Sequence, residues 1–281
     1  MPLTTPTASR RTLGVRLRKL RNDAGLTLDD VAERLLLSPA KISRLETGDR
    51  MPQLRDVREL GGFYGAPTVV RDELMELARQ ARQPGWWQDY RLPPQEDHYV
   101  GLEASALVID TWEPQLIPGL LQTPEYTDAV LGAFPSELGD RSRGVIAQVK
   151  VERRKRLLVD GGPQIRVILA EAVLALPMFP ADLMRRQFQH LLELSERTQV
   201  TLRVLRAAAG AHVGIHGAFV VLEFEPDATD GVVHLEGLAQ QEFLEKPDDL
   251  RLYRRAFELL GAVADDPDQT RDLLRRLIQP T

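Results

Sequence analysis

The sequence contains no cysteine among its 281 residues. This absence excludes a disulfide framework and any zinc or iron–sulfur centre built on thiolates. Apolar runs are short, since none approaches the roughly 18 residues that a membrane-spanning helix needs. Residues 1–9 lack the apolar core of a secretory signal peptide, and we expect them to form a disordered lead. These absences favour a cytoplasmic protein with no membrane partner.

Charge is distributed unevenly along a chain of ordinary composition. Hydrophobic residues make up 43% and charged residues 27%, and the length indicates about two domains. The net charge is −5, but residues 1–70 carry +4 and the remaining residues carry −9. Six basic residues and no acidic one occur within residues 1–22. This asymmetry favours a polyanion as the partner of the N-terminal part, although a solvated helix face would give the same pattern.

Helix signals predict an all-α domain over residues 10–82. Thr27-Leu-Asp-Asp30 forms a capping box for a helix over 27–36. Ser38-Pro39 combines an N-cap with a proline at the first position of a helix over 39–47. The short turn between these two helices gives the spacing of a helix-turn-helix.

The predicted helix over 39–47 has an outer face suited to the major groove of DNA. Ile42 and Leu45 are three residues apart and turn one side of the helix toward the core. The other side carries no large apolar residue and can present side chains to base edges. Arg44 is the strongest candidate there, because a guanidinium can donate two parallel hydrogen bonds to guanine. Contact with phosphate alone is the alternative for this residue.

Residues 13–32 and 38–48 together resemble the phage-repressor/Xre family of helix-turn-helix regulators. The resemblance implies that the protein binds double-stranded DNA and that Arg21 and Glu46 form a structural ion pair. In one departure, Leu28 stands where the family often has a phosphate-contacting Gln, which leaves Thr27 or backbone N–H groups to make that contact. The implied base contacts are Pro39, Ala40, Ser43 and Arg44, and the implied phosphate contacts are Thr27, Lys41, Arg50, Arg16 and Arg18.

The C-terminal part mixes helix and strand patterns. Residues 83–99 are rich in proline and aromatic side chains and are predicted to be a linker. Residues 100–281 are expected to form an α+β domain with a regulatory or dimerisation role, so the predicted fold class is an all-α helix-turn-helix domain followed by an α+β domain. Helices are expected at 100–111, 123–133, 141–159, 180–197, 248–263 and 267–279, and strands at 164–170, 200–206, 218–224 and 232–235.

The segment Trp112–Tyr126 is the most distinctive of the C-terminal part. Together with the stretches 152–156, 168–173 and 214–222 it resembles the C-terminal domain of the WhiJ-like group of actinobacterial regulators. The resemblance implies transcriptional control and a small partner protein encoded nearby. We expect the basic run 152–156 to be solvated or paired with acidic neighbours, with a contact to the DNA backbone as the alternative. We expect residues 114–126 to form a tightly packed corner, with a ligand or partner groove as the alternative. The residues of that groove would be Trp112, Pro118, Leu121, Tyr126, His212 and His216.

Catalytic and metal-binding patterns are weak. His212 and His216 have the spacing of a helical metal site, but the glycines around them predict a loop and no third ligand is evident. No metal and no cofactor are therefore predicted. No Ser/His/Asp order, phosphate loop or carboxylate pair stands out, which argues against an enzyme.

The sequence therefore predicts a DNA-binding transcriptional regulator that recognises a specific sequence. A short recognition helix reads only a few base pairs, so we expect a homodimer on a two-fold symmetric operator with half-sites about 34–36 Å apart or a multiple of that. The C-terminal domain is expected to sense a small-molecule ligand or to bind a small partner protein. The alternative is an antitoxin-like interaction protein that neutralises a small neighbouring protein.

Overall fold

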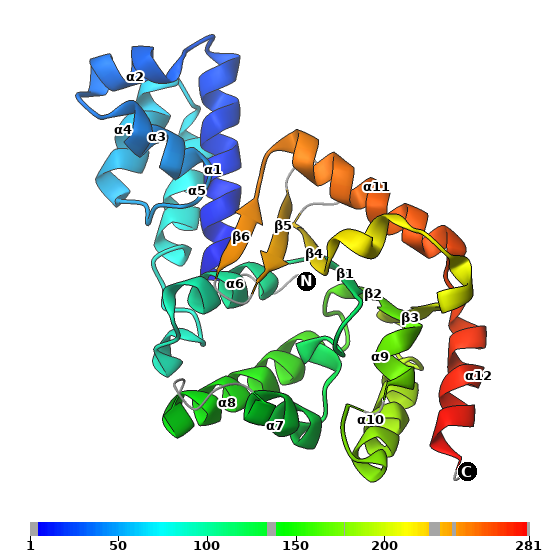
Figure 1. The fold of residues 1–281 in the computed structure, drawn as a ribbon. Helices are drawn as coiled ribbons and strands as arrows, with labels where there is room; N and C mark the ends of the chain where they lie inside the picture. The colour runs from blue at the N-terminus through cyan, green and yellow to red at the C-terminus, as the bar shows by residue number, and fades with distance from the viewer. Residues whose placement is uncertain (1–4, 134–138, 177, 225–230, 238–239, 280–281) are drawn as a thin grey trace. The chain divides into compact units, whose positions relative to one another are not determined.

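The computed structural model describes residues 5–133, 139–176, 178–224, 231–237 and 240–279 (Figure 1). The chain divides into two compact units, the first ending at Arg91 and the second beginning at Leu92. The boundary lies inside the segment 83–99, where the structure has a 3-10 turn, η1 (Gln88–Tyr90), and the start of a helix. No helix in the described ranges has the length and apolar character needed to cross a membrane.

The first unit is helical. Its helix α1 begins at Pro6, so the expectation of disorder as far as Ser9 is wrong for residues 6–9. The cause is a local start signal, because the Thr5 side chain accepts a hydrogen bond from the Ala8 amide and Pro6 occupies the first helical turn. The helices of this unit are α1 (Pro6–Asp23), α2 (Leu28–Leu35), α3 (Pro39–Glu46), α4 (Leu54–Phe63) and α5 (Thr68–Gln80).

Helices α1 and α3 approach each other closely at Gly14. A Cβ atom at this position would lie 2.5 Å from the carbonyl oxygen of Glu46 and 2.8 Å from that of Leu45. Only glycine therefore allows the two backbones to come so near. Around this crossing, the core buries Leu13 and Leu17 of α1 against Ile42 and Leu45 of α3, with further apolar residues from α2, α4 and α5.

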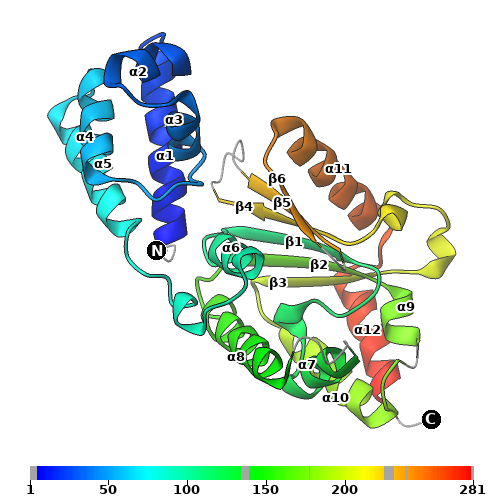
Figure 2. The same cartoon turned by 60° about the vertical axis from the view of Figure 1, so that its left-hand side comes forward.

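The second unit is built on a six-stranded mixed sheet in the order β3-β2-β1-β4-β5-β6 (Figure 2). Strands β1, β2 and β3 are parallel, whereas β4, β5 and β6 continue the sheet in antiparallel pairs. Helical and sheet domains thus follow one another, which confirms the predicted fold class. The strands are β1 (Val108–Glu113), β2 (Gln164–Ala170), β3 (Val200–Leu205), β4 (Phe219–Glu223), β5 (Gly231–Glu236) and β6 (Gln241–Leu244).

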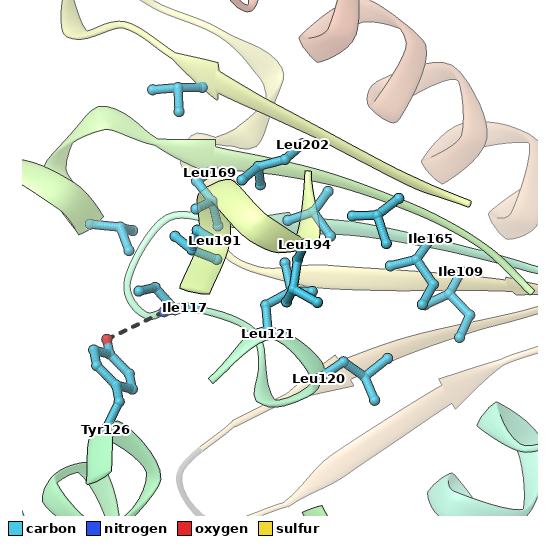
Figure 3. Close-up of a cluster of buried hydrophobic side chains, with 14 of the residues drawn as sticks. Ile109, Ile117, Leu120, Leu121, Tyr126, Ile165, Leu169, Leu191, Leu194 and Leu202 are labelled. Atoms are coloured by element: carbon cyan, nitrogen blue, oxygen red, sulfur yellow. Dashed lines mark hydrogen bonds between the residues drawn. The ribbon is translucent and has the colours of Figure 1, made fainter. Parts of the chain in front are cut away.

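Helices cover both faces of this sheet. On one face α11 packs over Trp112, Ile168 and Val221, and on the other face several helices pack over Ile109, Leu169 and their neighbours (Figures 2 and 3). The helices of this unit are α6 (Pro94–Glu103), α7 (Pro124–Ala133), α8 (Gly139–Leu157), α9 (Glu171–Ala175), α10 (Ala181–Leu194), α11 (Pro247–Val263) and α12 (Pro267–Ile278). Alternation along each strand separates the two cores.

The outer edge of β3 is closed by the segment that leads into α12. The Asp265 amide donates to the Val204 carbonyl at 2.8 Å, and the Val204 amide donates to the Thr270 hydroxyl oxygen at 3.2 Å. Thr270 is fully buried. Both backbone groups of Val204 are therefore satisfied without a further strand.

One predicted helix at the start of this unit is wrong, and one strand near its end was not predicted. The helix expected over 100–111 ends at Glu103, and Val108–Glu113 is instead the central strand β1. A run of apolar residues cannot by itself separate a buried strand from a buried helix. Strand β6 was not predicted, because its four residues carry almost no pattern.

Candidate nucleic-acid interface

Side-chain caps fix the starts of both helices of the helix-turn-helix. The Thr27 hydroxyl oxygen accepts from the Asp30 amide at 3.2 Å, and the Asp30 carboxylate accepts from the Thr27 amide at 2.8 Å. The Thr27 hydroxyl also donates to the Asp30 carboxylate at 2.6 Å, and this bond, together with the one from the Thr27 amide, lowers the pKa of Asp30. Ser38 caps α3 by accepting from the Lys41 amide at 3.2 Å. Thr27, predicted to contact phosphate, thus uses its hydroxyl in an internal cap, although the side chain remains exposed.

The turn between α2 and α3 contains a leucine in an unusual backbone conformation. Leu36 has φ +54° and ψ +39°, which is the left-handed region that glycine and asparagine prefer. Its side chain is 92% exposed, so it contributes almost nothing to the core. The backbone conformation of the turn is therefore unfavourable for Leu36, and burial of its side chain does not offset that cost.

The four predicted base contacts lie together on α3. Pro39, Ala40 and Arg44 are exposed and Ser43 is half-buried, while Ile42 and Leu45 point into the core. The Arg44 Nε donates to the Ala40 carbonyl at 3.2 Å, which holds the guanidinium along the outer side of the helix. An exposed arginine in this place can reach the edge of a guanine in a major groove.

The predicted phosphate contacts differ in how free they are. Lys41 points inward, with Nζ 2.6 Å from Asp56 Oδ2 and only 19% of its side chain exposed. Because its charge is paired with Asp56, Lys41 is less available to a phosphate than an exposed arginine is. The Arg50 amide donates to the Arg44 carbonyl at 3.0 Å, and its side chain is half-exposed at the end of this loop.

The arginines of α1 that were predicted to meet phosphate also contact their own unit. Arg16 Nη1 lies 2.6 Å from Glu73 Oε2, and Arg18 Nη2 donates to the Glu46 carbonyl at 3.3 Å. Both arginines remain about half exposed. An exposed pair such as Arg16–Glu73 is weak, so a phosphate can replace its carboxylate.

Arg21 and Glu46 form a two-pronged ion pair between α1 and the end of α3. Arg21 Nε donates to Oε1 at 2.7 Å and Nη2 donates to Oε2 at 2.8 Å, while Nη1 donates to the Leu26 carbonyl at 2.8 Å. Glu46 is buried, and its hydrogen bonds raise the pKa of Arg21. The pair ties α3 to α1 at the same crossing that Gly14 makes possible, and so helps to set the direction of α3.

The groove predicted in the second unit does not exist as one site. Trp112 and His212 belong to the α11 face of the sheet, with their ring centres 5.4 Å apart. Leu121 and Tyr126 belong to the core on the opposite face. Trp112, Leu121 and Tyr126 are all fully buried. The sheet lies between Trp112 on one face and Leu121 and Tyr126 on the other, so these residues do not line one groove.

The segment after Trp112 is instead a packed corner. The Tyr126 hydroxyl oxygen accepts from the Ile117 amide at 3.4 Å (Figure 3), and Gln122 Nε2 donates to the Ile117 carbonyl at 2.7 Å. Pro118 is half-buried and precedes the 3-10 turn η2 (Gly119–Leu121). These bonds satisfy the backbone of a sharp turn, as expected for a packed corner.

The loop that contains His212 and His216 is hydrogen-bonded to Trp112. Trp112 Nε1 donates to the Gly214 carbonyl at 3.0 Å, and a Cβ at Gly214 would lie 2.5 Å from the indole ring. His212 is half-buried and His216 is exposed at the end of η5 (Val213–His216). In the ranges that the structure covers, no three potential metal ligands are grouped.

A buried ion pair in the second unit was missed by sequence reasoning. Arg153 Nε donates to Glu103 Oε2 at 2.6 Å, and Tyr99 donates its hydroxyl proton to Glu103 Oε1 at 3.2 Å. The guanidinium also lies 5.3 Å from the centre of the Tyr99 ring. The basic run 152–156 was expected to be solvated or paired with acidic neighbours, and the partner Glu103 and the burial of Arg153 were not predicted. The missed signal was its spacing, because the buried residues Val149 and Leu157 stand four positions before and after it.

Two family models match the chain. The model of a helix-turn-helix domain matches residues 12–74, and the model of a domain of unknown function, DUF5753, matches residues 97–276. The chain belongs to the DUF5753 family. Comparisons with curated proteins and with solved structures gave no match. The helix-turn-helix domain indicates that the protein binds DNA and acts as a regulator, with the DUF5753 domain as its second part.

Proposed function

We propose that the protein is a transcriptional regulator that recognises a specific DNA sequence through α3. The observation that carries the proposal is the exposed side of α3, where Pro39, Ala40 and Arg44 face outward while Ile42 and Leu45 anchor the helix. The match of residues 12–74 to a helix-turn-helix domain supports it. Arg44 is the proposed base-reading residue, with Ser43 beside it.

The phosphate contacts in this proposal come from arginines that retain exposed guanidinium groups. Arg16 and Arg18 on α1 and Arg50 after α3 are the candidates, with Thr27 at the start of α2. A positive N-terminal part attached to a negative C-terminal part fits this division of labour, because phosphate contacts position a protein on DNA without reading its sequence. The net negative charge of the C-terminal part disfavours a broad DNA-binding surface on the second unit.

The finer features of the proposal come from the sequence resemblances. They are membership of the Xre type, a WhiJ-like role for the DUF5753 domain in the cytoplasm, and a homodimer on a two-fold symmetric operator. In this proposal the DUF5753 domain changes the activity of the DNA-binding domain when it binds a small molecule or a small partner protein. The two-fold symmetric operator follows from the few base pairs that one recognition helix can read.

Genomic selection tests the proposal. Full-length protein is mixed with sheared DNA from its source at about 150 mM salt, where nonspecific phosphate binding is weakened, and the bound fragments are sequenced. We expect enrichment of one symmetric motif. The Arg44→Ala variant should give weaker enrichment of a motif relaxed at one base position, whereas Arg58→Ala, which removes an exposed arginine of α4, should keep the full motif. Enrichment of no sequence by the wild-type protein would contradict the proposal, and a symmetric motif would support the dimer.

A further inference from the structure

A groove opens on the α11 side of the DUF5753 sheet, between α11 and the strands β2 and β3. Its volume is about 440 Å³, which is within the range of small-molecule sites. Its walls include both charged and apolar side chains. The lining residues used below are Arg166 of β2, Thr201 and Arg203 of β3, and Phe257, Glu258 and Gly261 of α11.

Arg166 is held rigidly at one side of this groove. Its Nε donates to Asp110 Oδ1 at 2.5 Å and its Nη2 donates to Asp110 Oδ2, so the pair is bidentate. Asp110 is buried, and the guanidinium lies 5.7 Å from the centre of the Phe257 ring. The Arg166 side chain is nevertheless 47% exposed. Nη1 forms no hydrogen bond with the residues that the structure covers, so it can donate to a ligand.

Arg203 is held at the other side by neutral groups. Its Nη1 donates to the Gly261 carbonyl at 2.7 Å and its Nε donates to the Asp265 carbonyl at 3.1 Å. Among the described residues no carboxylate lies within salt-bridge distance of Arg203. A half-buried positive charge without a counter-charge is costly, and an anion would relieve that cost.

We propose that this groove binds a small organic anion. Its carboxylate or phosphate group would accept from Arg166 Nη1 and Arg203 Nη2, with the Thr201 hydroxyl as a further donor, and its apolar body would lie against Phe257. Glu258 also lines the groove, and its carboxylate is paired with Arg255 at 3.0 Å in an exposed ion pair. The effect of the bound anion on DNA binding rests on the proposed function. Binding of the anion in the groove does not, because it requires no DNA.

Fluorine NMR with simple aromatic probes tests this site on the full-length protein. The probes are 4-fluorobenzoate and 4-fluorophenyl phosphate, which separate the two anion types, and 4-fluorobenzamide, which is neutral. We expect saturable binding of at least one anion and affinity for the amide about tenfold weaker, since a hydrogen bond to a charged group is worth about 1.5–3 kcal/mol. Arg203→Gln should weaken anion binding about tenfold, and Thr201→Val should weaken it severalfold.

Controls keep the test decisive. Arg186→Gln removes an exposed arginine of α10 and should leave the probe affinity unchanged. Equal binding of the anions and the amide, no saturable binding of either anion, or unchanged binding by folded Arg203→Gln would overturn the inference. If Arg203→Gln does not fold, Thr201→Val decides, because it replaces one strand-compatible residue by another. Probe binding without any selected DNA motif would overturn the regulator and leave the groove assignment intact.

Discussion

The two units of this protein use their most recognisable residues in opposite ways. In the helix-turn-helix unit, the residues that make the motif recognisable include Pro39, Ala40 and Arg44, which are exposed on α3. In the DUF5753 unit, the distinctive residues Trp112 and Tyr126 are fully buried and satisfy the backbone of neighbouring loops. A recognisable residue can therefore mark a binding surface in one domain and a folding constraint in the next. Burial decides which of the two it is.

Arg21–Glu46 in the first unit and Arg153–Glu103 in the second are both two-pronged, buried ion pairs. The comparison between them can be tested first by breaking the deeper pair, Arg153–Glu103. Glu103→Gln leaves the buried Arg153 without a counter-charge, and we expect the DUF5753 unit to lose about 4 kcal/mol of unfolding free energy. Chemical denaturation followed by circular dichroism measures it. Glu152→Gln is the matched control. Glu152 lies next to Arg153 on α8 and pairs with the exposed Lys155, so its loss should change stability little. Similar stabilities of the two variants would show that the buried pair contributes little.

The pair in the helix-turn-helix unit should matter somewhat less, because it is closer to solvent. Arg21→Ala removes the partner of Glu46, and we expect a loss of about 3 kcal/mol from this unit alone. The melting transition of the first unit should move while that of the second stays in place. Arg34→Ala, an exposed arginine of α2, serves as control. A shared shift of both transitions would show that the units do not unfold independently.

A pH series sharpens the comparison for the second unit. Burial raises the pKa of Glu113 from its ordinary 4.5 to about 7, although the amides of Gln115 and Leu116 act in the opposite direction. Since the folded state then holds the proton more tightly than the unfolded state, the contribution of Glu113 to stability is fully present below about pH 4.5 and is lost as the pH rises to about 7. Glu113→Gln should reduce this fall by about 1–2 kcal/mol.

Unfolding curves at pH 5 and pH 8 give the difference for each protein. Glu196→Gln, an exposed carboxylate that follows α10, should leave the pH dependence as in the wild type. If Glu113→Gln keeps the full fall in stability, Glu113 is ionised in the folded protein throughout this range.

On the binding surface, a single exposed residue should change recognition without changing stability. We expect Arg44→Ala to weaken binding to the selected operator by about 1–3 kcal/mol and to relax the preference at one base position. Fluorescence anisotropy against operators mutated at each position measures both effects. A uniform loss at all positions, with a smaller salt dependence, would assign Arg44 to phosphate contact.

The smallest expected effect is a gain. Leu36→Gly should stabilise the helix-turn-helix unit by about 0.5–1 kcal/mol, because glycine relieves the left-handed backbone and no packing is lost. The converse control is Gly25→Ala, since Gly25 has φ +70° and nothing near its missing side chain. It should destabilise the unit by about 1 kcal/mol. Thermal melts that fail to move in opposite directions would contradict this account.

The amount that could be predicted from sequence differs between the units for a physical reason. The caps at Thr27 and Ser38 act over three or four residues, so local spacing was enough to place α2 and α3. The candidate groove depended on which face of a sheet each residue takes, and this is set by strand register between distant segments. The sequence pattern predicted helix for residues 108–111, which are part of the central strand β1. Without that strand, the sequence could not show that Trp112 and Tyr126 lie on opposite faces of a sheet. The inward turn of Lys41 toward Asp56 was equally invisible, because its partner lies on another helix.

The closed edge of β3 has a consequence for how copies of this protein can assemble. An open edge strand is a template on which a second chain can add a strand by backbone pairing. At Val204 both backbone groups are already engaged by Asp265 and Thr270, so that template is interrupted. Two copies that meet on this side must therefore recognise each other through side chains, which can be changed one at a time without unravelling the sheet.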